Sequence, residues 1–436
     1  MIVSSRIDSQ ISLMFIAIIP VLAALLVLII IKVHPVFKRI FHTYDELNNV
    51  VQENVRGIRV VKSFNQEDHA IKKFKGISQS IYEDFAAGER LLAFNSPIMQ
   101  FFMYACMILI SWIGAKAVVA SGNSAALGMT TGDLTALFSY ATQILMALMM
   151  LSMVFAMITI SLASAHRIAE VLEEKTDIAN PTGAEMTVRD GSIRFEHVNF
   201  SYAAKADKKV LSDIDLSIAS GQTVGIIGGT GSSKSSLVQL IPRLYDVSSG
   251  RLLLGGVDVR KYDLETLRSA VAMVLQKNEL FSGTIKENLR WGNEAAGDEE
   301  MEEACRLACA DEFIQGFPDK YDTYIEQGGS NVSGGQKQRL CIARTLLKKP
   351  KVLILDDSTS AVDTHTDAMI RKAFKEEIPG TTKLIIAQRI SSIQDSDIII
   401  VMENGHVACV GDHETLMKSS EFYRGIYKSQ QKGSED

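Results

Sequence analysis

The stretch Thr223-Val-Gly-Ile-Ile-Gly-Gly-Thr-Gly-Ser-Ser-Lys-Ser-Ser236 decides the fold of the second part of this chain. Residues 223–227 form a short apolar run that predicts a buried strand, and the residues from Ser235 onward favour a helix. A glycine-rich turn joins the two. In a strand, turn and helix of this order, backbone N–H groups of the turn and of the helix start point at a bound phosphate. The stretch therefore predicts an α/β domain that holds a nucleotide.

The polar residues of this turn have separate expected roles. Lys234 reaches the β- and γ-phosphates of a nucleoside triphosphate, and the Ser235 hydroxyl binds its magnesium ion. Position 233 carries serine where the phosphate-loop pattern has glycine, but a serine still offers its backbone N–H. We expect the nucleotide to be lined by Gly228, Thr230, Gly231, Ser232, Ser233, Lys234, Ser235 and Ser236.

A second motif lies at Lys351-Val-Leu-Ile-Leu-Asp-Asp357. Its continuous apolar run is typical of a parallel strand buried on both faces. We expect Asp356 to hold magnesium through water and Asp357 to face the water that attacks the γ-phosphate. A longer carboxylate is expected at this second position, and a positioned general base is worth roughly 10²–10⁴-fold in rate. The shorter aspartate predicts slow hydrolysis, unless it reaches the attacking water through an additional water molecule.

Charge and hydropathy divide the chain into two parts. The 436 residues are 47% hydrophobic and carry a formal net charge of −6. Residues 1–180 hold 14 basic and 14 acidic residues, so the whole net charge lies in the remainder. A neutral apolar front and an acidic back predict a membrane part followed by a cytosolic part. The sequence has no basic patch of the kind that would indicate nucleic acid binding. The five cysteines show no CxxC pair and are expected to be free thiols.

Three apolar runs are long enough to cross a bilayer: 11–31, 97–120 and 134–160. A signal peptide is the alternative for the first run, but this run is too long and no small-residue cleavage site follows it. Buried core helices are the alternative for all three. Basic residues follow the first and third spans and the loop 121–133 has none, which places residues 33–96 inside the cell and the N-terminus outside.

Apolar residues recur at helical spacing along the cytoplasmic segment 33–96, as at Val50, Val51 and Val55. We expect the first span to continue as a helix of about 36 Å to Arg56, Gly57 to break it, and a short coupling helix to form the tip at about 58–65. An ordinary amphipathic hairpin is the alternative. Beyond the membrane part, 1–175, we expect a linker at 176–191, a soluble domain at 192–430 and a tail at 431–436.

With these motifs the chain resembles an ATP-binding cassette (ABC) half-transporter of the exporter type. Val332-Ser-Gly-Gly-Gln336 is similar to the signature motif of that family, and Phe200-Ser-Tyr202 is similar to its aromatic loop, which stacks on adenine. Gln276 matches the glutamine that senses magnesium and the γ-phosphate. Ser360-Ala-Val-Asp363 is similar to the loop that crosses the dimer interface. The resemblance implies that Ser333 and Gly335 close over the γ-phosphate of a partner subunit.

The resemblance covers most of the chain. For residues 192–430 it implies a P-loop nucleotide-binding domain in the cytoplasm, with ATP and Mg²⁺ as its ligands. Residues 1–175 are similar to the last three of the family's six spans, with the coupling helix at Arg59–Phe64. For these residues the resemblance implies an α-helical transmembrane domain of three helices with long cytosolic extensions, in a multi-pass protein of the cell membrane. The first three spans are absent, so the sequence is identified as an N-terminally truncated member.

Two departures from the family pattern fall at the catalytic positions. The family's switch histidine follows an Ile-Ala pair, and here the run is Ile386-Ala-Gln388-Arg389. A glutamine amide can hydrogen-bond a phosphate oxygen but cannot carry charge or shuttle a proton. Together with Asp357, Gln388 makes the chain similar to the degenerate-site subunit of heterodimeric multidrug-type exporters. That resemblance implies a second half-transporter as partner, a lipid bilayer around both, and amphipathic drugs or lipids as substrates.

Two other functions remain open at the level of sequence. A non-transporting membrane ATP sensor would also bind nucleotide and hydrolyse it poorly. An inert remnant of a gene would explain the missing spans, since three helices cannot enclose the usual cavity. The intact signature motif and the coupling tip favour the exporter.

Overall fold

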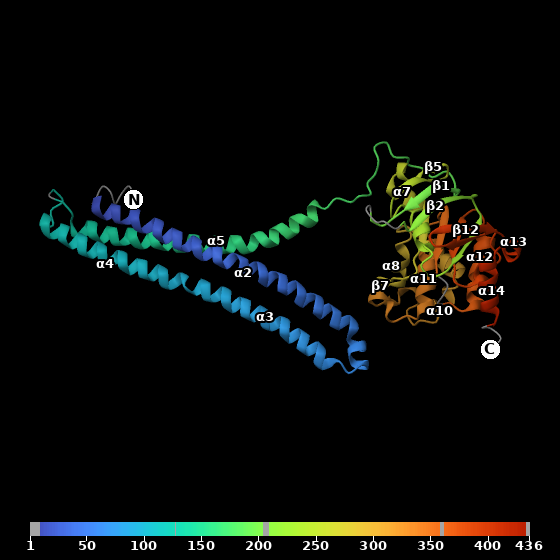
Figure 1. Cartoon of the computed structure of the whole chain (residues 1–436), viewed down its shortest axis with the longest axis horizontal. Coiled ribbons are helices and arrows are strands. Elements are labelled where there is room, and N and C mark those ends of the chain that lie inside the picture. Colours follow the sequence, from blue (N-terminus) through green and yellow to red (C-terminus); the bar gives the residue numbers. More distant parts are fainter. Residues whose placement is uncertain (1–8, 127, 204–208, 358–361, 433–436) are drawn as a thin grey trace. The chain divides into compact units, whose positions relative to one another are not determined.

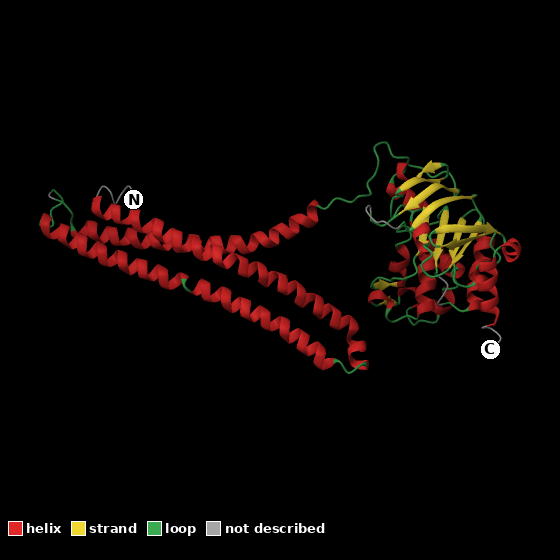
Figure 2. Cartoon of the chain, viewed as in Figure 1, coloured by secondary structure: helices red, strands yellow, loops and turns green. Residues whose placement is uncertain are grey.

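The structure is a computed structural model that describes residues 9–126, 128–203, 209–357 and 362–432. The chain divides into two compact units, Met1–Lys175 and Thr176–Asp436. Helices make up the first unit, and the strands lie in the second (Figure 2).

Long helices form the first unit: α2 (Ser9–Ser63), α3 (Glu67–Ala93), α4 (Asn95–Ser121) and α5 (Thr131–Glu173). By length and composition, three stretches could cross a membrane: Ile16–Ser63, Glu67–Ser121 and Thr131–Phe155. The expected α-helical transmembrane domain with three spans is thus confirmed. Helix α5 begins at a capping box. Thr130 Oγ1 accepts a hydrogen bond from Asp133 N at 3.2 Å, and Asp133 Oδ2 accepts one from Thr130 N at 3.0 Å.

Helices α2 and α3 run side by side as a long hairpin (Figure 1). Polar and aromatic contacts join the two arms along their length. Arg39 donates from Nε and Nη2 to the Asp84 carboxylate at 2.6–2.9 Å. Lys73 Nζ pairs with Glu53 Oε2 at 2.8 Å, and Phe37 packs edge-on against Phe85. The hairpin therefore has its own lateral contacts over the part that extends past the apolar spans.

The tip of this hairpin differs from the expectation. Instead of a break at Gly57 followed by a separate coupling helix at 58–65, α2 continues through Gly57 to Ser63. A Cβ at Gly57 would meet no atom within 4 Å, so this glycine is not required by packing. One glycine costs a helix about 1 kcal/mol, which neighbouring turns can absorb. Ile58, Val60 and Phe64 are all exposed at the tip, so it presents an apolar surface.

In the described part of the second unit the strands form three sheets. The largest has six strands in the order β12-β11-β3-β10-β9-β6, and all its pairs are parallel except β11 with β12. Its strands are β3 (Thr223–Gly228), β6 (Val271–Val274), β9 (Val352–Asp356), β10 (Thr382–Ile386), β11 (Ile398–Glu403) and β12 (His406–Gly411). The four-stranded sheet has the order β2-β1-β4-β5, with β1 (Ile193–Phe200), β2 (Leu211–Ile218), β4 (Ser249–Leu254) and β5 (Val257–Asp258). The two-stranded sheet pairs β7 (Gly283–Thr284) with β8 (Tyr324–Ile325).

Helices pack around these sheets and produce two apolar cores. Leu353, Leu355 and Ile385 belong to one core, and Val352, Ile354 and Leu384 to the other. Successive residues of the central strands thus point to opposite faces and are buried on both, as a continuous apolar run requires. The helices are α6 (Lys234–Gln239), α7 (Leu264–Ala270), α8 (Ile285–Arg290), α9 (Asp298–Leu307), α10 (Asp311–Gln315), α11 (Gly334–Leu346), α12 (Thr364–Glu377), α13 (His413–Ser419) and α14 (Glu421–Lys432), with 3₁₀ turns η1 (Val259–Lys261), η2 (Lys320–Asp322), η3 (Gln327–Gly329) and η4 (Ile390–Ser392). The expected α/β domain is confirmed.

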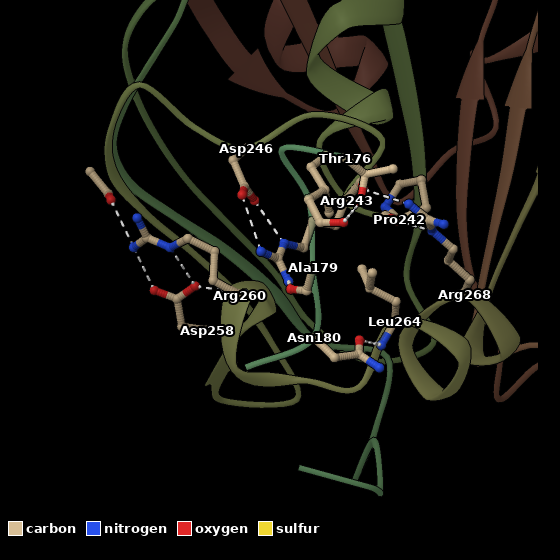
Figure 3. Close-up of polar contacts among 12 residues, drawn as sticks. Thr176, Ala179, Asn180, Pro242, Arg243, Asp246, Asp258, Arg260, Leu264 and Arg268 are labelled. Carbon is tan, nitrogen blue, oxygen red and sulfur yellow. Dashed lines mark hydrogen bonds and ion pairs between the residues drawn. The ribbon is translucent and has the colours of Figure 1, made fainter. Parts of the chain in front are cut away.

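The segment 176–191, expected as a linker, belongs to the second unit and packs against the rest of it (Figure 3). Asn180 Oδ1 accepts a hydrogen bond from Leu264 N at 2.8 Å, and its Nδ2 donates to Asp263 Oδ1 at 2.6 Å. Arg243 Nη1 donates to Ala179 O at 3.3 Å. Further along, Glu185 bridges to Tyr262 in parallel register. The segment is therefore held to the domain by its own polar contacts.

We predict that Asn180→Ala loosens this segment. The substitution removes both amide hydrogen bonds, each worth about 1 kcal/mol. Hydrogen–deuterium exchange across residues 176–185 of the purified chain should speed up by about fivefold. The exposed neighbour Thr182 offers a matched control, and Thr182→Ala should leave exchange unchanged. Equal acceleration by both variants would show that Asn180 does not hold the segment.

Candidate functional site

The glycine-rich turn after β3 places its polar residues at one edge of the six-stranded sheet. Gly228 ends β3, and a Cβ there would collide with the Met402 carbonyl. Gly231 has φ +80°, which favours glycine. The Ser232 side chain is buried, while Thr230 is exposed at the outside of the turn. The turn can follow this path because one glycine stands where a side chain would collide and another where φ is positive.

Lys234, the first residue of α6, lies across the turn that precedes it. Its Nζ donates to Gly228 O and Gly229 O, both at 2.9 Å, and to Ser232 Oγ at 3.3 Å. Burial lowers the pKa of the lysine, and the charges of Asp356 and Asp357 oppose that shift. The ammonium group is thus placed at the centre of the turn, where phosphate oxygens would be bound.

Ser233 adopts a backbone conformation that serine rarely takes. It precedes α6 with φ +72° and ψ +24°, in the left-handed region. Glycine occupies that region without steric cost, whereas other residues lose roughly 1 kcal/mol. The departure from glycine at this position therefore stores strain in the turn. Its carbonyl still accepts a hydrogen bond from Leu237 N at 3.1 Å.

Two oxygen ligands meet where β9 ends beside α6. Ser235 Oγ donates to Asp356 Oδ1 at 3.0 Å, and Asp356 is 3% exposed. Burial raises the pKa of Asp356, and the neighbouring Asp357 charge adds to this, while the Ser235 hydrogen bond and Lys234 oppose it. Magnesium is usually held by one or two protein oxygen ligands together with substrate phosphates and waters, and a buried carboxylate and a hydroxyl supply such oxygens here. The residues present therefore fit a magnesium ion.

The two departures from the family pattern contact each other. Gln388 Nε2 donates to Asp357 Oδ2 at 2.7 Å. Gln276 Nε2 approaches the same oxygen at 3.4 Å, so its amide faces the second aspartate, one residue beyond the magnesium ligand. Asp357 has φ +50°, a conformation in which aspartate is several-fold enriched over most residues. The backbone at this position thus suits the shorter carboxylate.

Tyr202 reaches the phosphate loop from the other sheet. Its hydroxyl is hydrogen-bonded to Ser236 Oγ at 2.9 Å. Its ring packs edge-on against Phe200 and Tyr245, at centroid distances of 4.8 and 5.0 Å. Tyr202 remains 54% exposed. An exposed aromatic ring beside α6 offers the flat surface that the adenine-stacking role requires.

The signature residues lie at the start of another helix. Ser333 caps α11, because its Oγ accepts from Gln336 N at 3.3 Å while Gln336 Oε1 accepts from Ser333 N at 2.9 Å. Gly335 O accepts from Arg339 Nε at 3.3 Å. Ser333 and Gly335 thus form a capped helix start. Ser360 and Ala361 of the interface loop lie outside the described residues, and Asp363 caps α12.

Two glutamines at the site were not expected from the sequence. Gln338 Nε2 donates to Asp357 O at 3.4 Å from the second turn of α11. Gln430, on α14, donates from Nε2 to Gln388 O at 2.7 Å. No local sequence pattern marks either one. Both contacts join segments that are far apart in the chain and come together only through the fold.

Comparison with known proteins agrees with this geometry. Residues 211–360 match the family described as ABC transporter, and residues 1–149 match the ABC transporter transmembrane region. The chain is 37% identical over 422 residues to an uncharacterized ABC transporter ATP-binding protein, YfiB, of Bacillus subtilis, covering 96% of this chain and 71% of that protein. It is also 37% identical to Rv1273c of Mycobacterium tuberculosis, over 94% of this chain and 70% of that one. Among solved structures, a bacterial Atm1-family ABC exporter with ATP bound superimposes with a TM-score of 0.83 and 26% identity, covering 97% of this chain and 75% of that chain.

We predict that Ser233→Gly stabilises the folded chain by about 0.5–1 kcal/mol, because glycine removes the strain at φ +72°. The measurement is the midpoint of thermal unfolding of the second unit within the purified full chain, followed by tyrosine and tryptophan fluorescence. Ser233→Ala is the matched control, since alanine removes the hydroxyl but keeps the steric conflict. A rise with alanine as large as that with glycine would place the effect in the hydroxyl group.

Proposed function

Because this chain belongs to the ABC transporter family, as a multi-pass membrane protein with a cytoplasmic ATP-binding domain of the exporter type, we propose that it is the degenerate-site subunit of a heterodimeric exporter. In this proposal its own site binds ATP and hydrolyses it slowly. Its signature motif completes a second site on a partner half-transporter that carries the full catalytic set.

The contacts of the phosphate loop support ATP and magnesium binding at the chain's own site. Lys234 would exchange its bonds to the turn carbonyls for phosphate oxygens. Ser235 and Asp356 would hold magnesium, which screens phosphate charge and orients the γ-phosphate when bound. Tyr202 would stack on the base, and Thr230, Gly231 and Ser236 would line the phosphates. These groups bind and orient, and none of them has to transfer a proton.

The contact between Gln388 Nε2 and Asp357 Oδ2 is the observation that carries the proposal. An amide is bonded to the carboxylate at the position from which the attacking water would be oriented. The amide donates an N–H but cannot take up or deliver a proton. A carboxylate one methylene short, with its oxygen held by an amide, is a poor general base. The site therefore keeps the groups that bind ATP, whereas the two groups that would promote its hydrolysis, Asp357 and Gln388, are weakened.

The capped start of α11 supports the role toward a partner. The capping box fixes Ser333 and Gln336, so the first turn of a 13-residue helix keeps a defined geometry. Backbone N–H groups at such a helix start favour an anion. In the proposed complex, Ser333 and Gly335 face the γ-phosphate bound by the partner.

The transported substrate is proposed from the surface of α5. Five methionines follow one another at helical spacing and are all exposed in this chain: Met146, Met149, Met150, Met153 and Met157. Methionine side chains adapt to irregular apolar surfaces and are common at sites that accept several ligands. A surface of this kind suits amphipathic drugs or lipids.

We predict that restoring both hydrolytic groups speeds turnover. The double variant Asp357→Glu with Gln388→His supplies a longer base and a proton-carrying ring, and should raise ATP turnover of the purified chain by at least about tenfold. The readout is release of inorganic phosphate under saturating ATP. Adding Lys234→Ala to the double variant should abolish the gain. Fast turnover by the unaltered chain, together with no gain in the double variant, would refute the degenerate site.

A second prediction separates the two sites of the complex. With its partner present, Gly335→Asp in this chain should lower total ATP turnover by at least about tenfold, because a carboxylate would repel the partner's γ-phosphate. Lys234→Ala should lower total turnover by less than about half. The reverse order of effects would assign the hydrolytic site to this chain.

A further inference from the structure

The C-terminal helix α14 is anchored firmly at its first turn. Tyr423 is fully buried, and its hydroxyl is hydrogen-bonded to His413 Nδ1 at 2.8 Å. Tyr423 N donates to Ser420 Oγ at 3.2 Å. The His413 ring also packs edge-on against Tyr423 and Tyr427. The helix thus starts from a fixed point in the core, and the position of its last turns is set from there.

Gln430, near the end of α14, makes a pair of hydrogen bonds to one short loop. Its Nε2 donates to Gln388 O at 2.7 Å, and its Oε1 accepts from Ile390 N at 2.9 Å. The loop is the connection between β10 and η4, and it carries Gln388. A side-chain amide has one carbonyl and one N–H₂ group, so it can bind a loop through a backbone acceptor and a backbone donor at once.

The loop has an open side where such support matters. A cavity of about 830 Å³ lies beneath it, with Asp357, Gln388, Ile390, Tyr427 and Gln430 among its lining residues. Gln430 spans one edge of the cavity and meets the loop at two backbone atoms.

We propose that Gln430 is a positioning residue for the nucleotide site: it holds the loop between β10 and η4 so that side chain 388 meets Asp357. Gln388 reaches Asp357 Oδ2 at 2.7 Å from the same residue whose carbonyl Gln430 binds. Gln430 contacts the backbone and not the side chain, so it acts on histidine at position 388 as it does on glutamine. The inference rests on the proposed role of Gln388 and Asp357 at the γ-phosphate.

The test uses the full chain and three substitutions on α14. Gln430→Leu removes both hydrogen bonds at similar size. Gln430→Glu keeps the acceptor for Ile390 N but loses the donor to Gln388 O. Ser429→Ala is the matched control, because the Ser429 hydroxyl donates to Ile426 O at 3.0 Å within α14 itself.

Hydrogen–deuterium exchange of the Ile390 amide is the first readout. Gln430→Leu should speed exchange about tenfold, since one hydrogen bond of about 1 kcal/mol protects that amide directly and the second fixes its loop. Gln430→Glu should remain close to the unaltered chain at this amide, and Ser429→Ala should leave it unchanged. Equal exchange in Gln430→Leu and Ser429→Ala would overturn the proposal.

Steady-state kinetics in the Asp357→Glu, Gln388→His background are the second readout. Adding Gln430→Leu should lower kcat for ATP by about fivefold to tenfold and leave KM within about twofold, because Lys234, Ser235 and Tyr202 are untouched. A parallel fall of kcat and rise of KM would indicate general loss of structure and would overturn the positioning role. Failure of the degenerate-site proposal is seen separately, as fast turnover by the unaltered chain together with no gain in that background before Gln430 is changed.

Discussion

The parallel register of the central strands is the constraint on which the nucleotide site depends. Asp356 ends β9 opposite Ile386, the last residue of β10, and Ile386 in turn lies opposite Ile226 of β3. Since parallel strands bring their carboxyl ends to the same edge, the residues that follow each strand converge there. Asp357 N also donates to Ile386 O at 3.1 Å. Asp357 is thus bonded both to the backbone of β10 and, through its side chain, to Gln388 just beyond that strand.

Two of the residues that depart from the family's sequence pattern have an unusual backbone conformation. Ser233 and Asp357 both have positive φ, at +72° and +50°. The first conformation disfavours serine, whereas the second is one that aspartate tolerates better than most residues. Local sequence preference and fold usually agree, and disagreements gather at functional sites. The strained turn at Ser233 lies beside Lys234, the residue on which phosphate binding depends.

Much of this architecture could be predicted from sequence, because local patterns determine it. The apolar runs at 223–227 and 352–355 become buried parallel strands, and the three long apolar stretches become long helices. Gly57 shows the limit of such patterns: one glycine costs a helix only about 1 kcal/mol, and α2 continues through it to Ser63. The contacts of Asn180 could not be predicted from local patterns either, because its partners at 263 and 264 lie over 80 residues away in the sequence. Gln338 and Gln430 were not predicted because their partners, 19 and 42 residues away, meet them only through the fold.

The way the loop at 388 is held separates its position from its chemistry. Gln430 binds the carbonyl of Gln388 and the N–H of Ile390, which every residue except proline at 390 would present. The side chain at 388 can therefore change from histidine to glutamine while these two backbone contacts are kept. Lys234, Ser235 and Asp356 are likewise independent of that change. A site built in this way can lose the capacity to move a proton and still keep the geometry that binds a nucleotide.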